Sequence, residues 1–197
     1  MTKERLLGFS DGVIAVIITI MVLELDAPEG ADWGALAPQM PVFLSYVLSF
    51  LFVAIYWVNH HHMFQAVEDI HGGVLWANLH LLFWMSITPF VTAWMGASHF
   101  AAVPVAAYGV LQLLSGIAYY ILSRILVRHH GEGSAFATAL GSDFKGRASL
   151  VAYAIAIPIA FSRPTVALSM YALVAAMWLV PDRRFERILG RDAPGRR

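Results

Sequence analysis

The longest uncharged stretch of the sequence is residues 70–123, which read IHGGVLWANLHLLFWMSITPFVTAWMGASHFAAVPVAAYGVLQLLSGIAYYILS. It contains no Asp, Glu, Lys or Arg, and residues 33–67 form a second stretch without them. A bilayer core of about 30 Å requires about 20 mostly apolar helical residues. The longer stretch therefore predicts two membrane-spanning helices, which separate around residues 96–99, with Pro104 at the start of the second one.

The composition of the whole chain agrees with this interpretation. Of its 197 residues, 59% are hydrophobic and 13% are charged, whereas soluble domains contain roughly 25% charged residues. A soluble domain of this size has too little core to bury so much apolar surface. The absence of cysteine excludes disulfides, thiol catalysis and cysteine-based zinc sites. The composition argues against a soluble enzyme, a disordered tail and a nucleic-acid binder, and it predicts an integral protein of the lipid bilayer.

The pattern predicts one all-α integral membrane domain over residues 1–197, with six transmembrane helices. These span about residues 5–25, 41–64, 73–94, 104–126, 145–161 and 164–180, and residues 181–197 form a basic tail. Pro89 predicts a kink in the third helix. The first helix is not predicted to be a cleaved signal peptide, because it carries Asp11 and Glu24 and lacks a small-residue cleavage pattern after its apolar run.

Lysine and arginine predict the orientation, because cytoplasmic loops carry an excess of them. With the N-terminus inside, Arg163 is the one of the 13 lysine and arginine residues that falls in an outside loop. The first outside loop instead carries Asp26, Glu29 and Asp32. We therefore expect a multi-pass protein of the cell membrane with both termini cytoplasmic. The arginine-rich tail is a topology signal in the simpler interpretation, and it contacts anionic lipid head groups in the other.

The first helix has one narrow face of small and medium side chains. This face is formed by Gly12, Val16, Thr19 and Leu23, with Arg5 on the same stripe. At 100° per residue, the first four of these positions fall within about 60° of one another. The opposite face, which suits burial in the bundle, carries Ile14, Ile17, Ile18, Met21 and Leu25. Spacing alone favours a helix-packing role for the stripe, since the helix is apolar all round.

Ser10 and Asp11 place polar groups near the cytoplasmic end of this helix. A carboxylate inside an apolar helix costs about 2.5–3.5 kcal/mol at the membrane centre, so such a group normally faces a partner or water. In one interpretation the two side chains bind neighbouring helices and hold the bundle together. In the other they line or support a polar pathway, and both interpretations can hold.

Several motifs resemble those of a known family. The first helix contains Arg5-x-x-x-Phe9-Ser10-Asp11, followed by GVIAVIIT and, at its end, VLEL. Residues 56–64 read YWVNHHHMF, residues 75–79 read LWANL and residues 88–93 read TPFVTA. Together these stretches resemble the signature of the transmembrane protein 175 family of lysosomal and prokaryotic potassium channels. The resemblance covers the first three helices, about half of the chain.

The resemblance implies a homotetramer of six-helix chains in which the first helix lines a central pore. It also implies conduction without a Thr-Val-Gly-Tyr-Gly filter loop, which this sequence lacks. By offset from the motif, Val16 is then a hydrophobic constriction, Thr19 a ring of hydroxyls and Leu23 a further apolar ring, with Gly12 on the same pore-facing stripe. Family members often have Ile or Leu at the constriction, where this chain has the smaller Val16.

Three consecutive histidines, residues 60–62, are candidate metal ligands, because imidazole binds Zn, Cu, Fe and Ni. Consecutive helical residues point about 100° apart and cannot chelate one ion, and ligand pairs need i, i+3 or i+4 spacing. No metal site is therefore predicted. We expect a hydrogen-bonded network at the cytoplasmic ends of the first three helices, formed by Arg5, Ser10, Asp11, His61 and Asn78.

The sequence therefore predicts a potassium-permeable channel that conducts monovalent cations passively and needs no cofactor. The alternative is a secondary transporter of a small solute or ion, although the sequence shows no internal repeat and no matched pair of broken helices. An intramembrane enzyme needs a nucleophile with a base, or a metal set. Only Asp11 with the histidines could serve, and they lie near one interface, so no enzyme is predicted.

Overall fold

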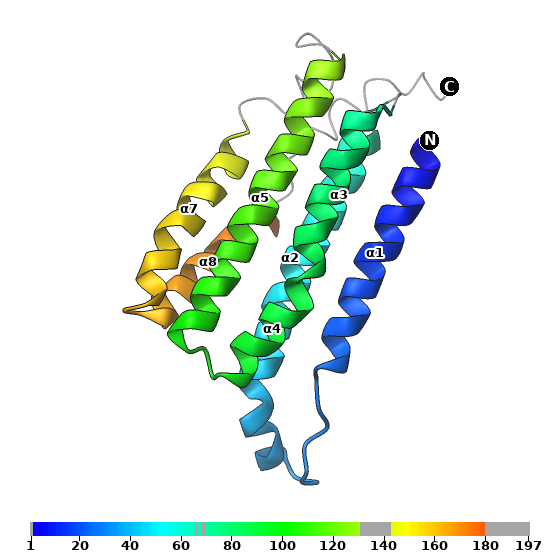
Figure 1. Cartoon of the computed structure of the whole chain (residues 1–197). Coiled ribbons are helices and arrows are strands. Elements are labelled where there is room, and N and C mark those ends of the chain that lie inside the picture. The colour runs from blue at the N-terminus through cyan, green and yellow to red at the C-terminus, as the bar shows by residue number, and fades with distance from the viewer. Residues whose placement is uncertain (1, 66, 68–69, 131–142, 180–197) are drawn as a thin grey trace, which may run out of the picture.

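The computed structural model describes residues 2–65, 67, 70–130 and 143–179, and the secondary structure in these ranges is helical. The elements are α1 (Lys3–Leu23), the 3-10 helix η1 (Trp33–Gln39), α2 (Met40–Gln65), α3 (Gly72–Ser86), α4 (Thr88–Ala97), α5 (Ala102–His130), α7 (Phe144–Ala160) and α8 (Pro164–Leu179). Figure 1 shows the helices side by side along one common direction, with α1 at one edge of the bundle. The predicted tail, residues 181–197, lies outside the described residues.

The main difference from the predicted helices lies at Pro89. The third predicted helix, residues 73–94, is two helices, α3 and α4, which meet at Ile87. Proline has no N–H to donate to the preceding turn, and Pro89 lies in the first turn of α4. The amide of Ile87 instead contacts the carbonyls of Trp84 and Met85 and so ends α3. The expected kink is thus an interruption of the helix.

Four helical stretches of the described residues are long and apolar enough to cross a membrane. They are Lys3–Leu23, Trp33–Gln65, Gly72–Ala97 and Ala102–His129. The other two helices are shorter: α7 has 17 residues and α8, which is apolar, has 16. The chain is thus an all-helical protein in which an interrupted helix, α3 with α4, accounts for one of the membrane-length stretches.

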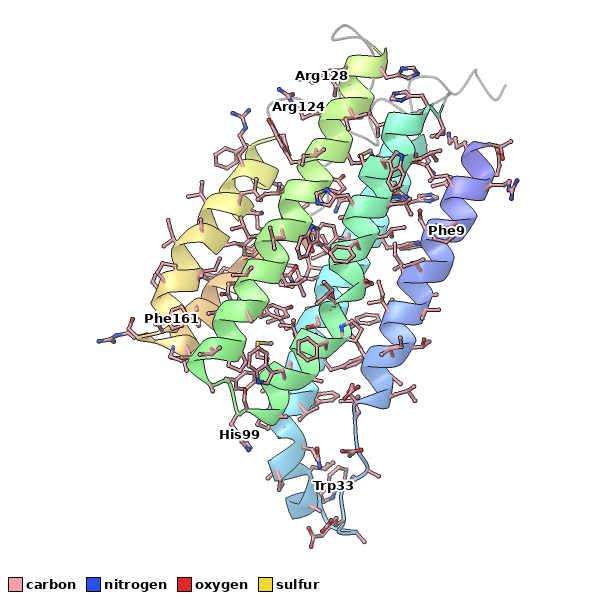
Figure 2. All side chains as sticks on the ribbon, in the orientation of Figure 1. Phe9, Trp33, His99, Arg124, Arg128 and Phe161 are labelled. Carbon is pink, nitrogen blue, oxygen red and sulfur yellow. The ribbon has the colours of Figure 1, made fainter. Side chains whose placement is uncertain are left out.

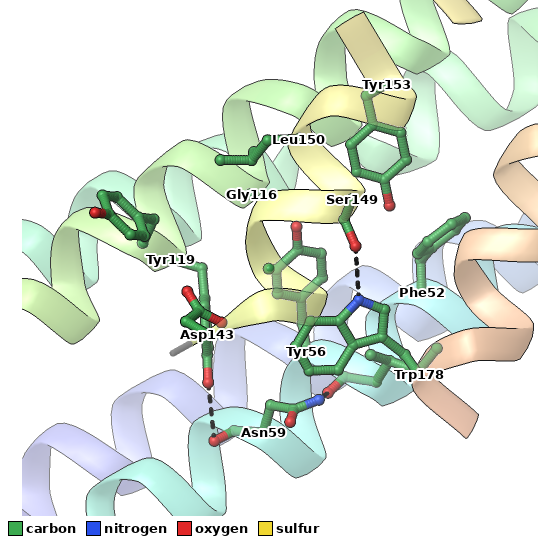
Figure 3. Close-up of a pocket in the computed structure, with 13 residues that line it drawn as sticks. Phe52, Tyr56, Asn59, Gly116, Tyr119, Asp143, Ser149, Leu150, Tyr153 and Trp178 are labelled. Carbon is green, nitrogen blue, oxygen red and sulfur yellow. Dashed lines mark hydrogen bonds between the residues drawn. The ribbon is translucent and has the colours of Figure 1, made fainter. Parts of the chain in front are cut away.

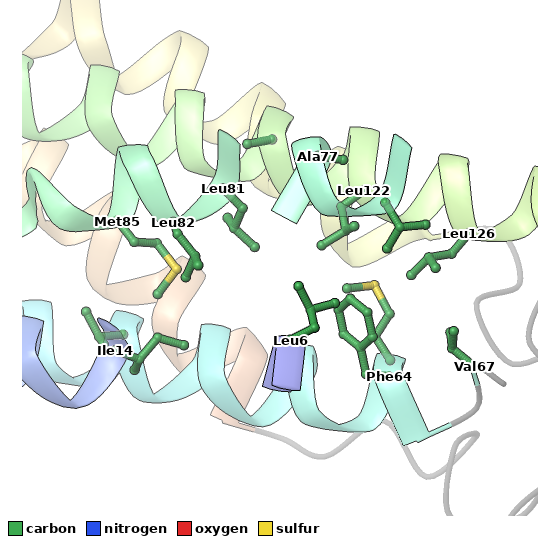
Figure 4. Close-up of a cluster of buried hydrophobic side chains, with 14 of the residues drawn as sticks. Leu6, Ile14, Phe64, Val67, Ala77, Leu81, Leu82, Met85, Leu122 and Leu126 are labelled. Carbon is green, nitrogen blue, oxygen red and sulfur yellow. The ribbon is translucent and has the colours of Figure 1, made fainter. Parts of the chain in front are cut away.

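Two clusters of buried apolar side chains hold the bundle together. The first, here called the α1 core, includes Leu6, Ile14, Phe64, Leu81 and Leu122 and joins α1, α2, α3 and α5 (Figure 4). The second, here called the tyrosine core, includes Phe52, Tyr108, Tyr153, Tyr171 and Val174 and joins α2, α4, α5, α7 and α8. In lipid the hydrophobic effect does not favour helix association, so close packing and buried hydrogen bonds must hold these helices together.

The tyrosine core shows such a close approach. The Tyr171 side chain lies over Gly109, where a Cβ atom would collide with its hydroxyl. The same hydroxyl donates a hydrogen bond to the carbonyl of Val105 at 3.2 Å. Glycine at this position therefore brings α8 against α5, which contributes side chains to both cores.

Candidate functional site

The first helix packs on one side only. α1 contacts α2, α3 and α4, and it stands at the edge of the chain in Figure 1. Ile14, Ile17 and Met21 are buried, at 3%, 3% and 1% exposure, as the helical arithmetic predicted for the face opposite the stripe. Ile18 and Leu25, also predicted for that face, are half-buried.

The stripe lies on the uncovered side of α1. Val16 is 54% and Leu23 is 77% exposed, Thr19 is exposed, and no atom lies within 4 Å of a Cβ built on Gly12. The Thr19 hydroxyl donates a hydrogen bond to the carbonyl of Val16 at 2.9 Å. Because that bond uses the only hydroxyl hydrogen, the oxygen lone pairs of Thr19 stay available as acceptors for a cation.

A row of buried, hydrogen-bonded polar side chains joins α1 to α3 and α2. The Ser10 hydroxyl donates to the carbonyl of Leu6 at 2.9 Å and accepts a hydrogen bond from Nδ2 of Asn78 at 2.9 Å. Oδ1 of Asn78 lies 2.7 Å from Nε2 of His60. Since an amide oxygen only accepts, Nε2 of His60 carries the proton of this bond. The three side chains are each no more than 1% exposed and join α1, α3 and α2.

A second set of polar side chains, which is exposed, lies beside this buried row. Oδ1 of Asp11 accepts a hydrogen bond from Nε1 of Trp57 at 2.9 Å. The Trp57 ring stacks on the ring of His61, with 6.0 Å between the centroids. Nε2 of His61 lies 2.8 Å from Nε2 of Gln65. Asp11 therefore links α1 to the outer side of α2 and does not lie in the buried interior.

The expected network of five residues is thus divided and partly replaced. Ser10 and Asn78 do meet, but their partner is His60 and not the predicted His61. Asp11 and His61 belong to the exposed group around Trp57. Arg5 is exposed and makes no side-chain hydrogen bond or ion pair with another described residue. Phe9, also part of the motif, is 51% exposed on the uncovered side.

The burial pattern of α2 explains why His60 is the partner. Buried positions recur on this helix at Ser49, Val53, His60 and Phe64. These positions are spaced by four, seven and four residues, which keeps them on one face of a helix. His61 is one residue further and points about 100° away. Because α2 is apolar on nearly every side, its sequence does not mark this buried face, and no local signal separates His60 from His61.

Lys3 is a further contact that the sequence analysis did not identify. Its ammonium group donates to the carbonyl of Val67 at 2.7 Å and contacts the carbonyl of Gln65 at 3.5 Å. It thereby ties the first turn of α1 to the end of α2. No group of three or more His, Cys, Asp or Glu residues within the described ranges is placed to hold a metal ion.

The four apolar helical stretches that are long enough to cross a membrane define the class of the chain, a helical membrane protein. Residues 5–89 match the family described as the endosomal/lysosomal potassium channel TMEM175. A Chryseobacterium protein named as a potassium channel is 52% identical over 189 residues, which cover 96% of this chain and 98% of the relative. A potassium channel of Streptomyces collinus is 35% identical over 129 residues, covering 60% of this chain and 61% of the relative. The chain belongs to the TMEM175 family, whose members are ion channels of membranes and not enzymes.

The fold agrees with this membership. A crystal structure described as a lysosomal potassium-selective channel TMEM175 homolog from Chamaesiphon minutus superposes with a TM-score of 0.78. The match covers 90% of this chain and 96% of the other, at 24% sequence identity. At this identity the likeness establishes the fold, and the roles of individual residues have to be argued from the chain itself.

Proposed function

We propose that four copies of this chain form a potassium-permeable channel in the cell membrane, with the α1 helices around a central pore. The observation that carries the proposal is the uncovered stripe of Gly12, Val16, Thr19 and Leu23 on a helix whose other side is buried. One chain presents one such helix and cannot enclose a pore. Closed cyclic symmetry supplies the remaining walls in the simplest way.

In this assembly the stripe acts through rings of identical side chains. A ring of Val16 side chains excludes water and gates conduction, because an ion there loses hydration and finds no replacement ligands. One turn away, a ring of Thr19 oxygens replaces part of the hydration shell of a dehydrated cation. The bond from each hydroxyl to the Val16 carbonyl directs the lone pairs away from the backbone and toward the pore. Conduction then requires no Thr-Val-Gly-Tyr-Gly filter loop and no cofactor.

The charge distribution supports an orientation with both termini in the cytoplasm and six helices crossing the membrane. Arg124 and Arg128 lie at the end of the bundle where α1 begins (Figure 2). Trp33, His99 and Phe161 lie at the opposite end. Lysine and arginine are retained on the cytoplasmic side, so the α1 start is the inner end. The names of the Chryseobacterium and Streptomyces collinus relatives, both potassium channels, support the choice of permeant ion.

Recording in planar bilayers tests the proposal. We expect unitary currents, and a reversal potential under K⁺ on one side and Na⁺ on the other that favours K⁺. A channel dissipates a gradient without coupling, so saturable and coupled uptake without unitary currents would instead identify a transporter. Native mass spectrometry in mild detergent should show a tetramer, and a stable monomer would contradict the proposed pore.

A further inference from the structure

A cavity of about 50 Å³ lies between α2, α5, α7 and α8 (Figure 3). Its aromatic wall is formed by Phe52, Tyr56, Tyr119, Tyr120, Tyr153 and Trp178. A water molecule needs about 10–15 Å³ of such space, so the cavity has room for a group of a few heavy atoms. Asp143, the residue before α7, also lines it.

Two hydroxyls of this wall have no hydrogen-bond partner among the described residues, those of Tyr56 and Tyr153. Tyr153 is 3% exposed. Other polar groups of the wall are paired: the Tyr119 hydroxyl donates to the carbonyl of Asn59 at 3.4 Å, and Nε1 of Trp178 donates to Ser149 at 2.9 Å. Tyr56 is half-buried, and both hydroxyl oxygens remain accessible rather than fully buried, so they are open to a polar group at the cavity wall.

The charge at the cavity indicates the sign of that group. Burial raises the pKa of the Asp143 carboxyl, and this effect outweighs the backbone hydrogen bond of Gly146 and the charges of Arg147 and Arg124. The ionised carboxylate is therefore less well solvated than it would be in water. A cation in the cavity would stabilise its ionised form.

The aromatic wall already attracts cations. The guanidinium carbon of Arg124 lies 5.6 Å from the centre of the Tyr120 ring, and the Lys145 ammonium lies 5.9 Å from the Trp178 ring. Both distances fall within the range of about 6 Å at which a cation is held by an aromatic face. Two of the rings thus hold a cation of the chain itself, and the other rings of the wall offer the same electrostatic attraction.

We propose that this cavity binds a small alkylammonium group, with the rings of Tyr56 and Tyr153 around it and the Asp143 carboxylate as its counter-charge. A primary ammonium has three donors, and the hydroxyl oxygens of Tyr56 and Tyr153 accept from it. Alkylammonium is the chemistry shared by free amines and by the ethanolamine head groups of lipids. Asp143 lies at the inner end of the bundle in the proposed orientation, within reach of both sources.

The test uses the full chain in dodecyl maltoside, a detergent without an amine. Methylammonium chloride is titrated against equal ionic strength of KCl, and the melting temperature is followed. We expect a saturable rise of about 2 °C or more, since ligand binding to the folded state stabilises it. Asp143→Asn should abolish the rise, and Tyr153→Phe, which removes only the hydroxyl, should weaken the apparent affinity about fivefold.

Two variants outside the cavity serve as matched controls. Asp26→Asn removes a carboxylate from the loop after α1, and Tyr46→Phe removes a hydroxyl elsewhere on α2, so both should retain the wild-type rise. If the melting temperature shows no saturable rise, or if the rise persists in Asp143→Asn, the proposal is overturned. The cavity would then hold only water. If Asp143→Asn does not fold, Tyr56→Phe takes its place, and an unchanged affinity in that variant and in Tyr153→Phe would equally overturn the proposal.

Nanodiscs distinguish the two sources of the group. If discs of phosphatidylglycerol with phosphatidylethanolamine raise the melting temperature in an Asp143-dependent way and remove the response to methylammonium, the lipid head group occupies the cavity. If the methylammonium response is the same in these discs and in discs of phosphatidylglycerol alone, the occupant is a free amine. Neither measurement depends on ion conduction, so their outcome is separate from that of the proposed channel function.

Discussion

The ammonium group of Lys3 bridges from the first turn of α1 to the carbonyl oxygen of Val67, 2.7 Å away. Val67 is 1% exposed and belongs to the α1 core. The bond is therefore anchored in packed structure at its accepting end, while α1 stands uncovered on its other side. Any rotation of α1 about its own axis has to carry this contact along or break it.

Lys3→Met should lower the melting temperature, because it removes the donor and keeps the length of the side chain. Hydrogen bonds to charged groups contribute about 1.5–3 kcal/mol, which corresponds to a loss of about 3 °C or more for a chain of this size. Thermal unfolding in detergent measures it. Arg5→Met is the control, since Arg5 has no side-chain partner among the described residues. Equal losses in both variants would show that the contact with Val67 does not contribute.

Val16→Asn and Ile17→Asn compare adjacent positions with opposite exposure, 54% and 3%. In the proposed pore, Val16→Asn wets the constriction and raises single-channel conductance. Ile17→Asn instead buries an amide in the α1 core at a cost of about 1–3 kcal/mol, so it should mainly reduce the yield of folded protein. Conductance in bilayers and yield in detergent give both readouts. Similar effects at the two positions would mean that the pore-facing stripe has been placed on the wrong side.

Thr19→Val should lower the preference for K⁺ over Na⁺ and leave the assembly intact. The two side chains have nearly the same shape, but valine offers no lone pairs to a dehydrated cation. The reversal potential under bi-ionic conditions measures the change, and native mass spectrometry checks the oligomer. An unchanged reversal potential would remove Thr19 from the selectivity of the channel.

His60→Ala should destabilise the protein far more than His61→Ala. The first substitution leaves the buried Oδ1 of Asn78 without a partner, at a cost of about 1–3 kcal/mol in addition to the lost packing. The second removes an exposed ring that stacks on Trp57. Parallel unfolding curves of the two variants provide the measurement, and a larger loss for His61→Ala would contradict the observed division of the polar network.

Asp143→Asn should raise the melting temperature at neutral pH in the absence of amines. Burial raises the pKa of this carboxyl, so the folded protein binds the proton more tightly than the unfolded chain does. The stabilisation from that proton is present at low pH and is lost as the pH rises through the raised pKa. The variant, which resembles the protonated form, should therefore differ most from wild type at neutral pH and least in acid. Asp26→Asn, in an exposed loop, should show no such dependence, and a lower melting temperature of Asp143→Asn at neutral pH would refute the argument.

The helical period predicted three buried positions on α1, although the helix is apolar all round and spacing alone favoured a packing role for the uncovered stripe. Ile14, Ile17 and Met21 are buried as that period requires. The sequence did not distinguish His60 from His61, because three identical neighbours carry no pattern of their own. The choice between them depends on which face of α2 is buried. The interruption at Ile87 was anticipated only as a kink.

The cavity between α2, α5, α7 and α8 could not be predicted from the sequence, for a different reason. Its wall combines Phe52 on α2, Tyr119 on α5, Tyr153 on α7 and Trp178 on α8. No local spacing connects positions so far apart in the chain, and aromatic residues in apolar helices are common. Only the packing of α5 against α7 and α8 brings these rings to one place.

Because α5 contributes to both the α1 core and the tyrosine core, the molecule has two parts that meet at this helix. One part carries the uncovered face of α1, and the other is the α7–α8 hairpin, whose main contacts with the rest of the bundle are with α5 and α2. A displacement of the hairpin therefore reaches α1 through α5 and α2. A label or a cross-link placed on the hairpin would leave the uncovered face of α1 unobstructed, and substitutions there would be tolerated as long as the surface of α5 kept its shape.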